Sequence, residues 1–249
     1  MDAPRLLLIS DFTEIQWTIK PQLEQWAEVA SYDPPGVGDE PAADLPQHQA
    51  MVERGLAELD RLGWERFFVV ADGWGIPTGV GIAAERGDGL AGLVLTHASL
   101  GHSTEGERPS VSPEVYAAMT QLIRQDAPSF IRHGIAQATG GSVDEELADR
   151  ILERLPSEGM LEAWEALTAP VAYADRLVAV DCPMLLVKHE GCLISTSEGF
   201  EDAVAALPDA ETAAVPDAPT TSGEFAEVLR RFCLERQRHL ERYEGSDGL

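Results

Sequence analysis

The feature that most constrains the fold is a series of short apolar runs that alternate along the chain with amphipathic segments. Strands that are buried on both faces appear as such uninterrupted runs, and segments of helical period cover those faces. We therefore predict an α/β fold with a mostly parallel sheet flanked by helices. The expected strands lie at residues 6–9, 29–32, 67–70, 92–95, 183–187 and 212–215, and the expected helices of the core include residues 21–29, 47–62, 198–207 and 224–243.

Residues 103–176 interrupt this alternation, because they contain no clear strand but several amphipathic segments. We predict that they form a helical cap inserted into a core domain made of residues 1–102 and 177–249. The expected cap helices lie at residues 113–124, 128–138, 143–155 and 160–167. No run of about 18 apolar residues occurs, so no segment is expected to span a membrane.

Charge and cysteine content limit the expected partners. The chain has 18 lysine and arginine residues against 43 aspartate and glutamate residues, a net charge of −25. Such a surface repels nucleic acids and anionic membranes, so neither is an expected partner. Cys182, Cys192 and Cys233 are sparse and lack the spacing of a metal site, which favours reduced thiols, a cytoplasmic location and no metal. No P-loop or full dinucleotide-binding pattern follows residues 36–38, so no cofactor is expected. The N-terminus does not resemble a signal peptide.

One turn has a distinctive pattern. The expected strand at residues 67–70 leads abruptly through Ala71, Gly73 and Gly75 into a helix that begins near Pro77. Small residues two positions apart allow a sharp backbone turn between a strand and a helix. Together with three other segments, this turn resembles the α/β-hydrolase superfamily in order and spacing. The segments that carry the resemblance are residues 32–38, 69–77, 182–187 and 207–216.

The resemblance covers roughly residues 5–100 and 178–235 and implies an α/β-hydrolase fold with a helical cap. In this superfamily, a serine at the turn, an acid after a later strand and a histidine after the last strand form the catalytic triad. The corresponding positions here hold Gly73, Cys192 and Thr220. Serine hydrolysis by the usual route is therefore not expected.

Asp72 directly precedes the turn position. Superfamily members that use an aspartate nucleophile typically have Trp-Gly directly after it, whereas Gly73 separates Asp72 from Trp74 and Gly75 here. The register therefore places Asp72 one residue early. A covalent ester on Asp72 would also lack the downstream histidine that activates water. Asp72 stays an alternative nucleophile.

The remaining groups suit a non-hydrolytic reaction. The resemblance implies that the backbone N–H groups of Phe12 and Trp74 form an oxyanion hole, which does not depend on side chains. His97 follows a strand at the sheet edge where such folds bind ligands, and an imidazole titrates near neutral pH. Asp11 and Asp72 are further acid–base candidates. The preferred hypothesis is an enzyme of the isomerase, epimerase, cyclase or lyase type.

Cys192 offers an atypical hydrolytic alternative. Loops after neighbouring strands converge on the pocket in this fold, so Cys192 and His97 are expected to lie close together. A cysteine–histidine pair would produce a thiolate nucleophile. The simpler interpretation of a sparse cysteine is a small buried apolar residue.

The pocket is expected to bind a bulky, largely apolar small molecule, because aromatic residues dominate the candidates for its wall. The expected substrate-binding residues are Phe12, Trp17, Gly73, Trp74, Ser99, His102, Tyr116, Phe130, Trp164 and Thr220. Two non-enzymatic hypotheses stay open, because a fold alone does not determine function. They are a receptor or carrier of a small molecule, and a scaffold whose own side chains fill the pocket. The sequence does not determine the oligomeric state.

Overall fold

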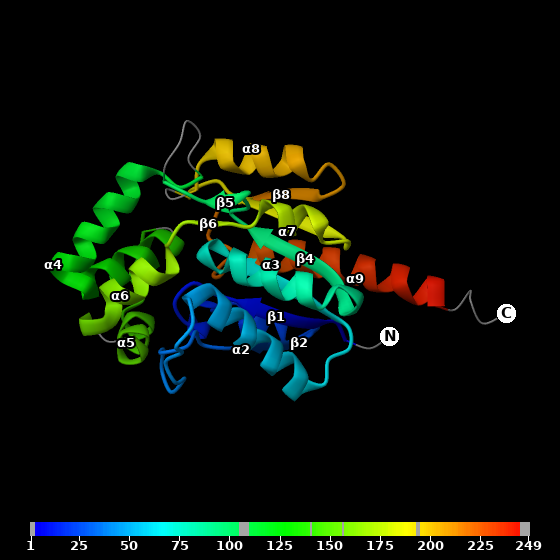
Figure 1. Cartoon of the computed structure of the whole chain (residues 1–249), viewed down its shortest axis with the longest axis horizontal. Helices are drawn as coiled ribbons and strands as arrows, with labels where there is room; N and C mark the ends of the chain where they lie inside the picture. Colours follow the sequence, from blue (N-terminus) through cyan, green and yellow to red (C-terminus); the bar gives the residue numbers. More distant parts are fainter. Residues whose placement is uncertain (1–2, 105–109, 140, 156, 193–194, 245–249) are drawn as a thin grey trace.

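Figure 1 shows the computed structural model of the chain, which describes residues 3–104, 110–139, 141–155, 157–192 and 195–244. Its centre is a six-stranded sheet in which every neighbouring pair of strands is parallel. In spatial order the strands are β2 (Glu28–Ser31), β1 (Arg5–Ile9), β3 (Phe67–Asp72), β4 (Leu90–Thr96), β7 (Met184–His189) and β8 (Glu211–Val215). The predicted parallel sheet is confirmed, and each predicted strand belongs to it.

Alternate strand residues face opposite sides of the sheet, and helices cover both sides. Leu7 and Val69 belong to the core on one side, whereas their neighbours Leu6 and Phe68 belong to the core on the other. Burial on both faces explains why the strands appear as uninterrupted apolar runs. The first side is covered by α2 (Gln47–Leu62), α3 (Ile76–Glu85), α7 (Ala174–Ala179) and α8 (Ser197–Ala206), and the second by α1 (Lys20–Leu23) and α9 (Gly223–Glu244).

The helix predicted at residues 21–29 is shorter in the structure, where α1 ends at Leu23. The following residues form turns, and β2 begins at Glu28, whose N–H donates to the carbonyl of Pro4 at 2.8 Å. The apolar spacing of Trp26 and Ala27 continues the helical pattern, but pairing of β2 with β1 takes the chain out of the helix.

The cap lies beyond the carboxyl ends of the strands, at one end of the molecule in Figure 1. Its helices are α4 (Pro113–Ala138), α5 (Glu145–Arg154) and α6 (Ser157–Leu167), and a short antiparallel pair, β5 (Gly101–His102) and β6 (Val171–Ala172), lies beside it. Within the described ranges, none of the helices combines the length and the apolar character that a membrane span requires.

Helix α4 consists of two halves joined at a kink. Asp126 has non-helical backbone angles (φ −158°, ψ 81°), and Pro128 follows it. A proline inside a helix removes one hydrogen bond and disfavours the helical conformation before it. The carboxylate of Asp126 accepts the N–H of Ser129 at 3.1 Å and so caps the second half. The two halves correspond to the helices predicted at 113–124 and 128–138.

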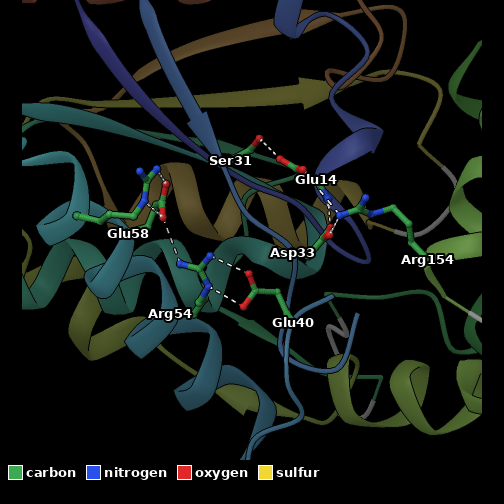
Figure 2. A network of polar contacts seen from close by, with 8 residues as sticks. Glu14, Ser31, Asp33, Glu40, Arg54, Glu58 and Arg154 are labelled. Atoms are coloured by element: carbon green, nitrogen blue, oxygen red, sulfur yellow. Dashed lines mark hydrogen bonds and ion pairs between the residues drawn. The ribbon is translucent and has the colours of Figure 1, made fainter. Parts of the chain in front are cut away.

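Polar contacts fasten α5 of the cap to the loops after β1 and β2 (Figure 2). The guanidinium group of Arg154 forms an ion pair with the buried carboxylate of Asp33 and lies 3.9 Å from Glu14. Asp33 also accepts the N–H of Glu14 at 2.9 Å, and Glu14 accepts the hydroxyl of Ser31 at 2.7 Å. The carbonyl of Arg154 accepts the N–H of Gly38 at 2.9 Å. These contacts fix α5, because displacing it would leave the charge of Asp33 buried and unpaired.

An aromatic cluster joins the cap to the core. Trp164 of α6 is almost completely buried, and its ring centroid lies 5.1 Å from that of Trp74 and 5.4 Å from that of Phe130. The ring of Trp164 also stacks on Phe12 at 6.0 Å. The indole N–H of Trp164 donates to Thr120 Oγ1 at 2.9 Å, so its polar atom is satisfied inside the cap.

Candidate active site

A cavity of about 180 Å³ lies between the carboxyl ends of the central strands and the cap. Its floor is polar, and its walls are mostly apolar. Ionisable groups therefore lie beneath an apolar chamber, at the edge where parallel sheets bind ligands. The floor is formed by Asp11, Asp72, His97, His189 and Cys192. The apolar wall residues are Phe12, Trp74, Met119, Phe130, Ile131, Ile135, Leu147, Ile151 and Trp164.

Glycine occupies the turn between β3 and α3. The single 3₁₀ turn η2 (Gly73–Gly75) connects the two elements, and Gly73 has a φ of +49°. A Cβ atom added to Gly73 would lie 3.0 Å from both carboxylate oxygens of Asp11. Glycine therefore suits both the backbone conformation and the space, because Asp11 fills the volume into which a side chain would project.

The side chain of Asp11 accepts hydrogen bonds from backbone N–H groups of this turn. Its carboxyl group accepts the N–H of Gly75 at 3.2 Å, and the N–H of Trp74 also donates to it. The N–H of Phe12, which was the second expected oxyanion donor, donates to Gln16 Oε1 at 3.0 Å. The prediction of free oxyanion donors on Phe12 and Trp74 is therefore wrong, because nearby side chains already accept their hydrogen bonds.

Asp11 is a carboxyl group of the floor that favours its protonated form. Burial raises its pKa well above the ordinary value, and the negative charge of Asp72 raises the pKa further. The positive charge of His97 and the two N–H groups of the turn act in the opposite direction without outweighing burial. Asp11 is therefore suited to donate a hydrogen bond or a proton into the cavity.

His97 follows β4 in the left-handed backbone region. Its φ is +59°, and among the described residues other than glycine it has the only positive φ. Such a conformation costs a non-glycine residue about 1 kcal/mol or more and is typical of functional sites. The N–H of His97 donates to the carbonyl of Val187 at 2.9 Å, which ties the residue to β7.

The two ring nitrogens of His97 face different partners. Nδ1 lies 3.4 Å from Asp72 Oδ1 and 3.4 Å from Thr96 Oγ1, and the Thr96 hydroxyl donates to Asp72. Nε2 lies 3.3 Å from Nδ1 of His189. Asp72 therefore orients the imidazole and stabilises its positive charge, while the opposite nitrogen faces the floor of the cavity.

Cys192 completes this cluster from the loop after β7. One nitrogen of His97, one nitrogen of His189 and the sulfur of Cys192 all lie within 4.8 Å of one another. The sulfur also accepts the N–H of Ser195 at 3.4 Å. The predicted approach of Cys192 to His97 is thus present, and the same three side chains form a group that could hold a metal ion.

The charges of Cys192 and His97 stabilise each other. Burial raises the pKa of Cys192, but the positive charge of His97 and hydrogen bonds from His189, His97 and Ser195 lower it to about 5. Burial lowers the pKa of His97, but the charge of Cys192 and the contact with Asp72 raise it well above its usual value. The pair is therefore expected to exist as a thiolate and an imidazolium.

The remaining predicted binding residues lie in and around this site, with one exception. Those that line the main cavity are Phe12, Trp74, Phe130, Trp164 and Thr220. Those that line an adjoining cavity of about 60 Å³, which shares the polar floor, are Gly73, Trp74, Ser99 and His102. Tyr116 lines a third small cavity next to His102 and stacks on Trp164.

Trp17 is the exception, and its predicted place in the pocket is wrong. Its ring lies in the core on the opposite side of the sheet, 6.4 Å from the ring of Phe225. The single turn η1 (Glu14–Gln16), closed by a capping box between Thr13 and Gln16, redirects the chain before Trp17. His189 is the opposite case, because the sequence does not predict it as a site residue and it lies on the cavity floor with His97 and Cys192.

His102 is held in its neutral form. It is 7% exposed, and its ring packs edge-on against Trp74 and Tyr173. Burial lowers the pKa of His102 to about 3, and the charge of His48 acts in the same direction. A histidine in an unfolded chain has a pKa of about 6.5, so the unfolded state binds a proton that the folded state excludes below that pH.

We expect acidification to destabilise the fold through His102. Between about pH 7 and pH 5, this residue alone is expected to lower the free energy of unfolding by about 2 kcal/mol. Urea denaturation at both pH values measures the loss, and His102→Phe, which keeps an aromatic ring, is the control. An equal loss in both proteins would assign the effect to other titrating groups.

No protein-family model and no curated protein matches the chain. Solved structures do match it over nearly its whole length. An enol-lactonase from Burkholderia xenovorans LB400 is 16% identical, with a TM-score of 0.71 over 96% of this chain and 92% of that chain. A thermophilic esterase from Thermogutta terrifontis is 20% identical, with a TM-score of 0.72 over 94% of this chain and 90% of that chain.

An esterase from Rhodococcus sp. ECU1013 is 17% identical, with a TM-score of 0.76 over 93% of this chain and 90% of that chain. These structures share the α/β-hydrolase fold, and the similarity confirms the fold that the sequence predicts. At such low identity the similarity shows the fold alone, and the chemistry depends on the residues on the cavity floor.

Proposed function

We propose that the chain is a cysteine-dependent enzyme that hydrolyses or transfers acyl groups of a largely apolar small molecule. The observation that carries the proposal is the series Asp72–His97–Cys192 on the cavity floor, in which a carboxylate contacts one nitrogen of an imidazole and a thiol lies near the other. An orienting acid, a base and a nucleophile in this order form the arrangement that nucleophilic catalysis needs.

The reaction follows from the roles of these three groups. The thiolate of Cys192 attacks the acyl carbon of an ester, and the alcohol leaves with a proton from the imidazolium of His97. A thioester to Cys192 remains. His97 then takes a proton from water, the resulting hydroxide attacks the thioester, and the thiolate is released with the acid. Asp72 holds the imidazole in place throughout.

Asp11 replaces the usual oxyanion hole in this proposal. Its carboxyl group lines the same cavity as Cys192, and burial favours its protonated form. A protonated carboxyl group donates a hydrogen bond to the oxygen on which negative charge develops, as backbone N–H groups do in other hydrolases. The N–H groups of Trp74 and Gly75 donate hydrogen bonds to Asp11 and so orient its carboxyl group.

The walls indicate the substrate class. Apolar side chains from α4, α5 and α6 face the floor across the cavity. They provide an apolar chamber for the acyl chain or the ring of the substrate. The net charge of −25 disfavours an anionic substrate, so a neutral ester or thioester suits the site best.

Two of the other hypotheses, the non-hydrolytic enzyme and the carrier, receive less support. A non-hydrolytic reaction at free backbone donors loses its basis, because Gln16 accepts the N–H of Phe12 and Asp11 accepts the N–H of Trp74. A carrier needs an apolar pocket, whereas the cavity of this chain has ionisable groups on its floor. One of these groups, Asp11, accepts the N–H of Gly75 in the turn.

Selective alkylation tests the proposal. With limiting iodoacetamide at neutral pH, we expect Cys192 to react about tenfold or more faster than an ordinary cysteine, because its thiol is already ionised. Glutathione in the same reaction is the reference for an ordinary thiol, and Cys182 should react more slowly than either, since burial raises its pKa to about 12. Mass analysis over time gives these rates. A Cys192 rate no higher than that of glutathione, or one that His97→Asn does not lower, would overturn the proposal.

A further inference from the structure

The cluster of His97, His189 and Cys192 has the geometry of a three-ligand metal site. The two imidazole nitrogens that face each other lie 3.3 Å apart, and the sulfur lies within 4.8 Å of both rings' ligand atoms. In a tetrahedral zinc site with Zn–N bonds of about 2.0–2.1 Å, two nitrogen ligands lie about 3.3 Å apart. The spacing of the two histidines therefore already matches one edge of such a tetrahedron.

The surroundings of the cluster also fit a metal. Asp72 contacts the far nitrogen of His97, which is the usual partner of a metal-binding imidazole and fixes its orientation. The N–H of Ser195 donates to the sulfur of Cys192, as expected for a thiolate ligand. The negative charges of Cys192 and Asp72 would balance a divalent cation. All three ligands also line the main cavity, which leaves the fourth coordination position open toward it.

We infer that His97, His189 and Cys192 bind a zinc ion, with the fourth coordination position open to the cavity. One thiolate and two imidazoles are ligands that zinc prefers, whereas magnesium and calcium prefer oxygen. The inference goes beyond the proposed function. It also has a consequence for it, because a sulfur bonded to zinc is not free to attack an acyl group. Zinc therefore inhibits the enzyme reversibly.

Cobalt titration tests the site without any activity measurement. Metal-free protein is titrated with Co²⁺ in the presence of excess Mg²⁺, which occupies exposed carboxylates. We expect one Co²⁺ per chain, the intense visible absorption of a tetrahedral site and a thiolate-to-cobalt charge-transfer band. Added Zn²⁺ should displace the cobalt. Weak absorption typical of octahedral oxygen ligands would overturn the inference.

Matched variants assign the ligands. We expect His189→Gln to weaken Co²⁺ and Zn²⁺ binding by about a hundredfold or more, and Cys192→Ser to remove the charge-transfer band. Cys182→Ser is the control and should bind as the wild type does. Urea denaturation checks that each variant folds. If His189→Gln does not fold, His189→Asn replaces it in the binding measurement. Unchanged binding in the folded His189 variant would contradict the assignment.

The two proposals fail separately. Fast alkylation of Cys192 without tetrahedral cobalt binding would leave the cysteine chemistry in place and remove the metal site. Tight cobalt binding with slow alkylation of the metal-free protein would support the metal site and contradict the cysteine chemistry. If both hold, bound Zn²⁺ should protect Cys192 from iodoacetamide, and a chelator should restore its reactivity.

Discussion

Replacing Cys192 by serine is expected to reduce kcat/KM for esters by about a thousandfold or more, because loss of a nucleophile removes most of the catalysis of such a group of residues. The lowered pKa of Cys192 and the raised pKa of His97 favour a thiolate before the attack, whereas a serine hydroxyl would have to lose its proton during the attack. p-Nitrophenyl esters of short and medium acyl chains, assayed on metal-free protein, provide the measurement.

Two further variants separate the possible mechanisms. Cys182→Ser should leave the rate unchanged, since Cys182 lies outside the described cavities. His97→Asn should remove activity about as strongly as Cys192→Ser, because the two residues act as a unit. Activity that survives Cys192→Ser but not His97→Asn would contradict covalent catalysis. It would favour an acid–base reaction by His97 and the neighbouring aspartates instead.

The fold could be predicted from the sequence because its determinants are local. The strands at 67–70 and 92–95 are buried on both faces, so their apolar runs are uninterrupted. The end of helix α1 could not be predicted from the sequence, because pairing of β2 with β1 decides where the helix ends. Tertiary pairing therefore overrides the helical spacing of Trp26 and Ala27.

The site could be predicted only where chain topology brings residues together. His97 and Cys192 follow neighbouring parallel strands, so their approach follows from the order of the sheet. The contact of Asp11 with the turn at Gly73 depends on side-chain lengths and could not be read from spacing. The same holds for His189, whose role depends on which way the last residue of β7 points.

The contact between Asp11 and Gly73 explains why the turn after β3 does not carry the nucleophile in this chain. Any side chain at position 73 would meet the carboxyl group of Asp11 and would need a φ that favours glycine. The same carboxyl group accepts a hydrogen bond from the N–H of Gly75 in the turn. The turn after β3 thus provides the space and the hydrogen bond that position Asp11. The groups suited to covalent chemistry come instead from the loops after β4 and β7.

Trp164→Ala is expected to lower the free energy of unfolding by about 3–5 kcal/mol, the usual cost of removing a large buried aromatic side chain. Trp164 contacts Phe12 and Trp74 of the core and Phe130 of the cap, and its N–H is bonded to Thr120. The substitution removes contacts of both parts at once. Urea denaturation should therefore show one transition, shifted to lower urea concentration.

Trp164→Phe is the matched control for this prediction. It keeps an aromatic ring among Phe12, Trp74 and Phe130 and loses only the second ring and the hydrogen bond to Thr120, so we expect a smaller loss of about 1–2 kcal/mol. A separate early transition in Trp164→Ala would show that the cap unfolds independently of the sheet. The network around Arg154 and Asp33 argues against this, because it fastens α5 to the core at a second place. A loss below about 1 kcal/mol for Trp164→Ala would mean that the aromatic cluster does not couple the two parts.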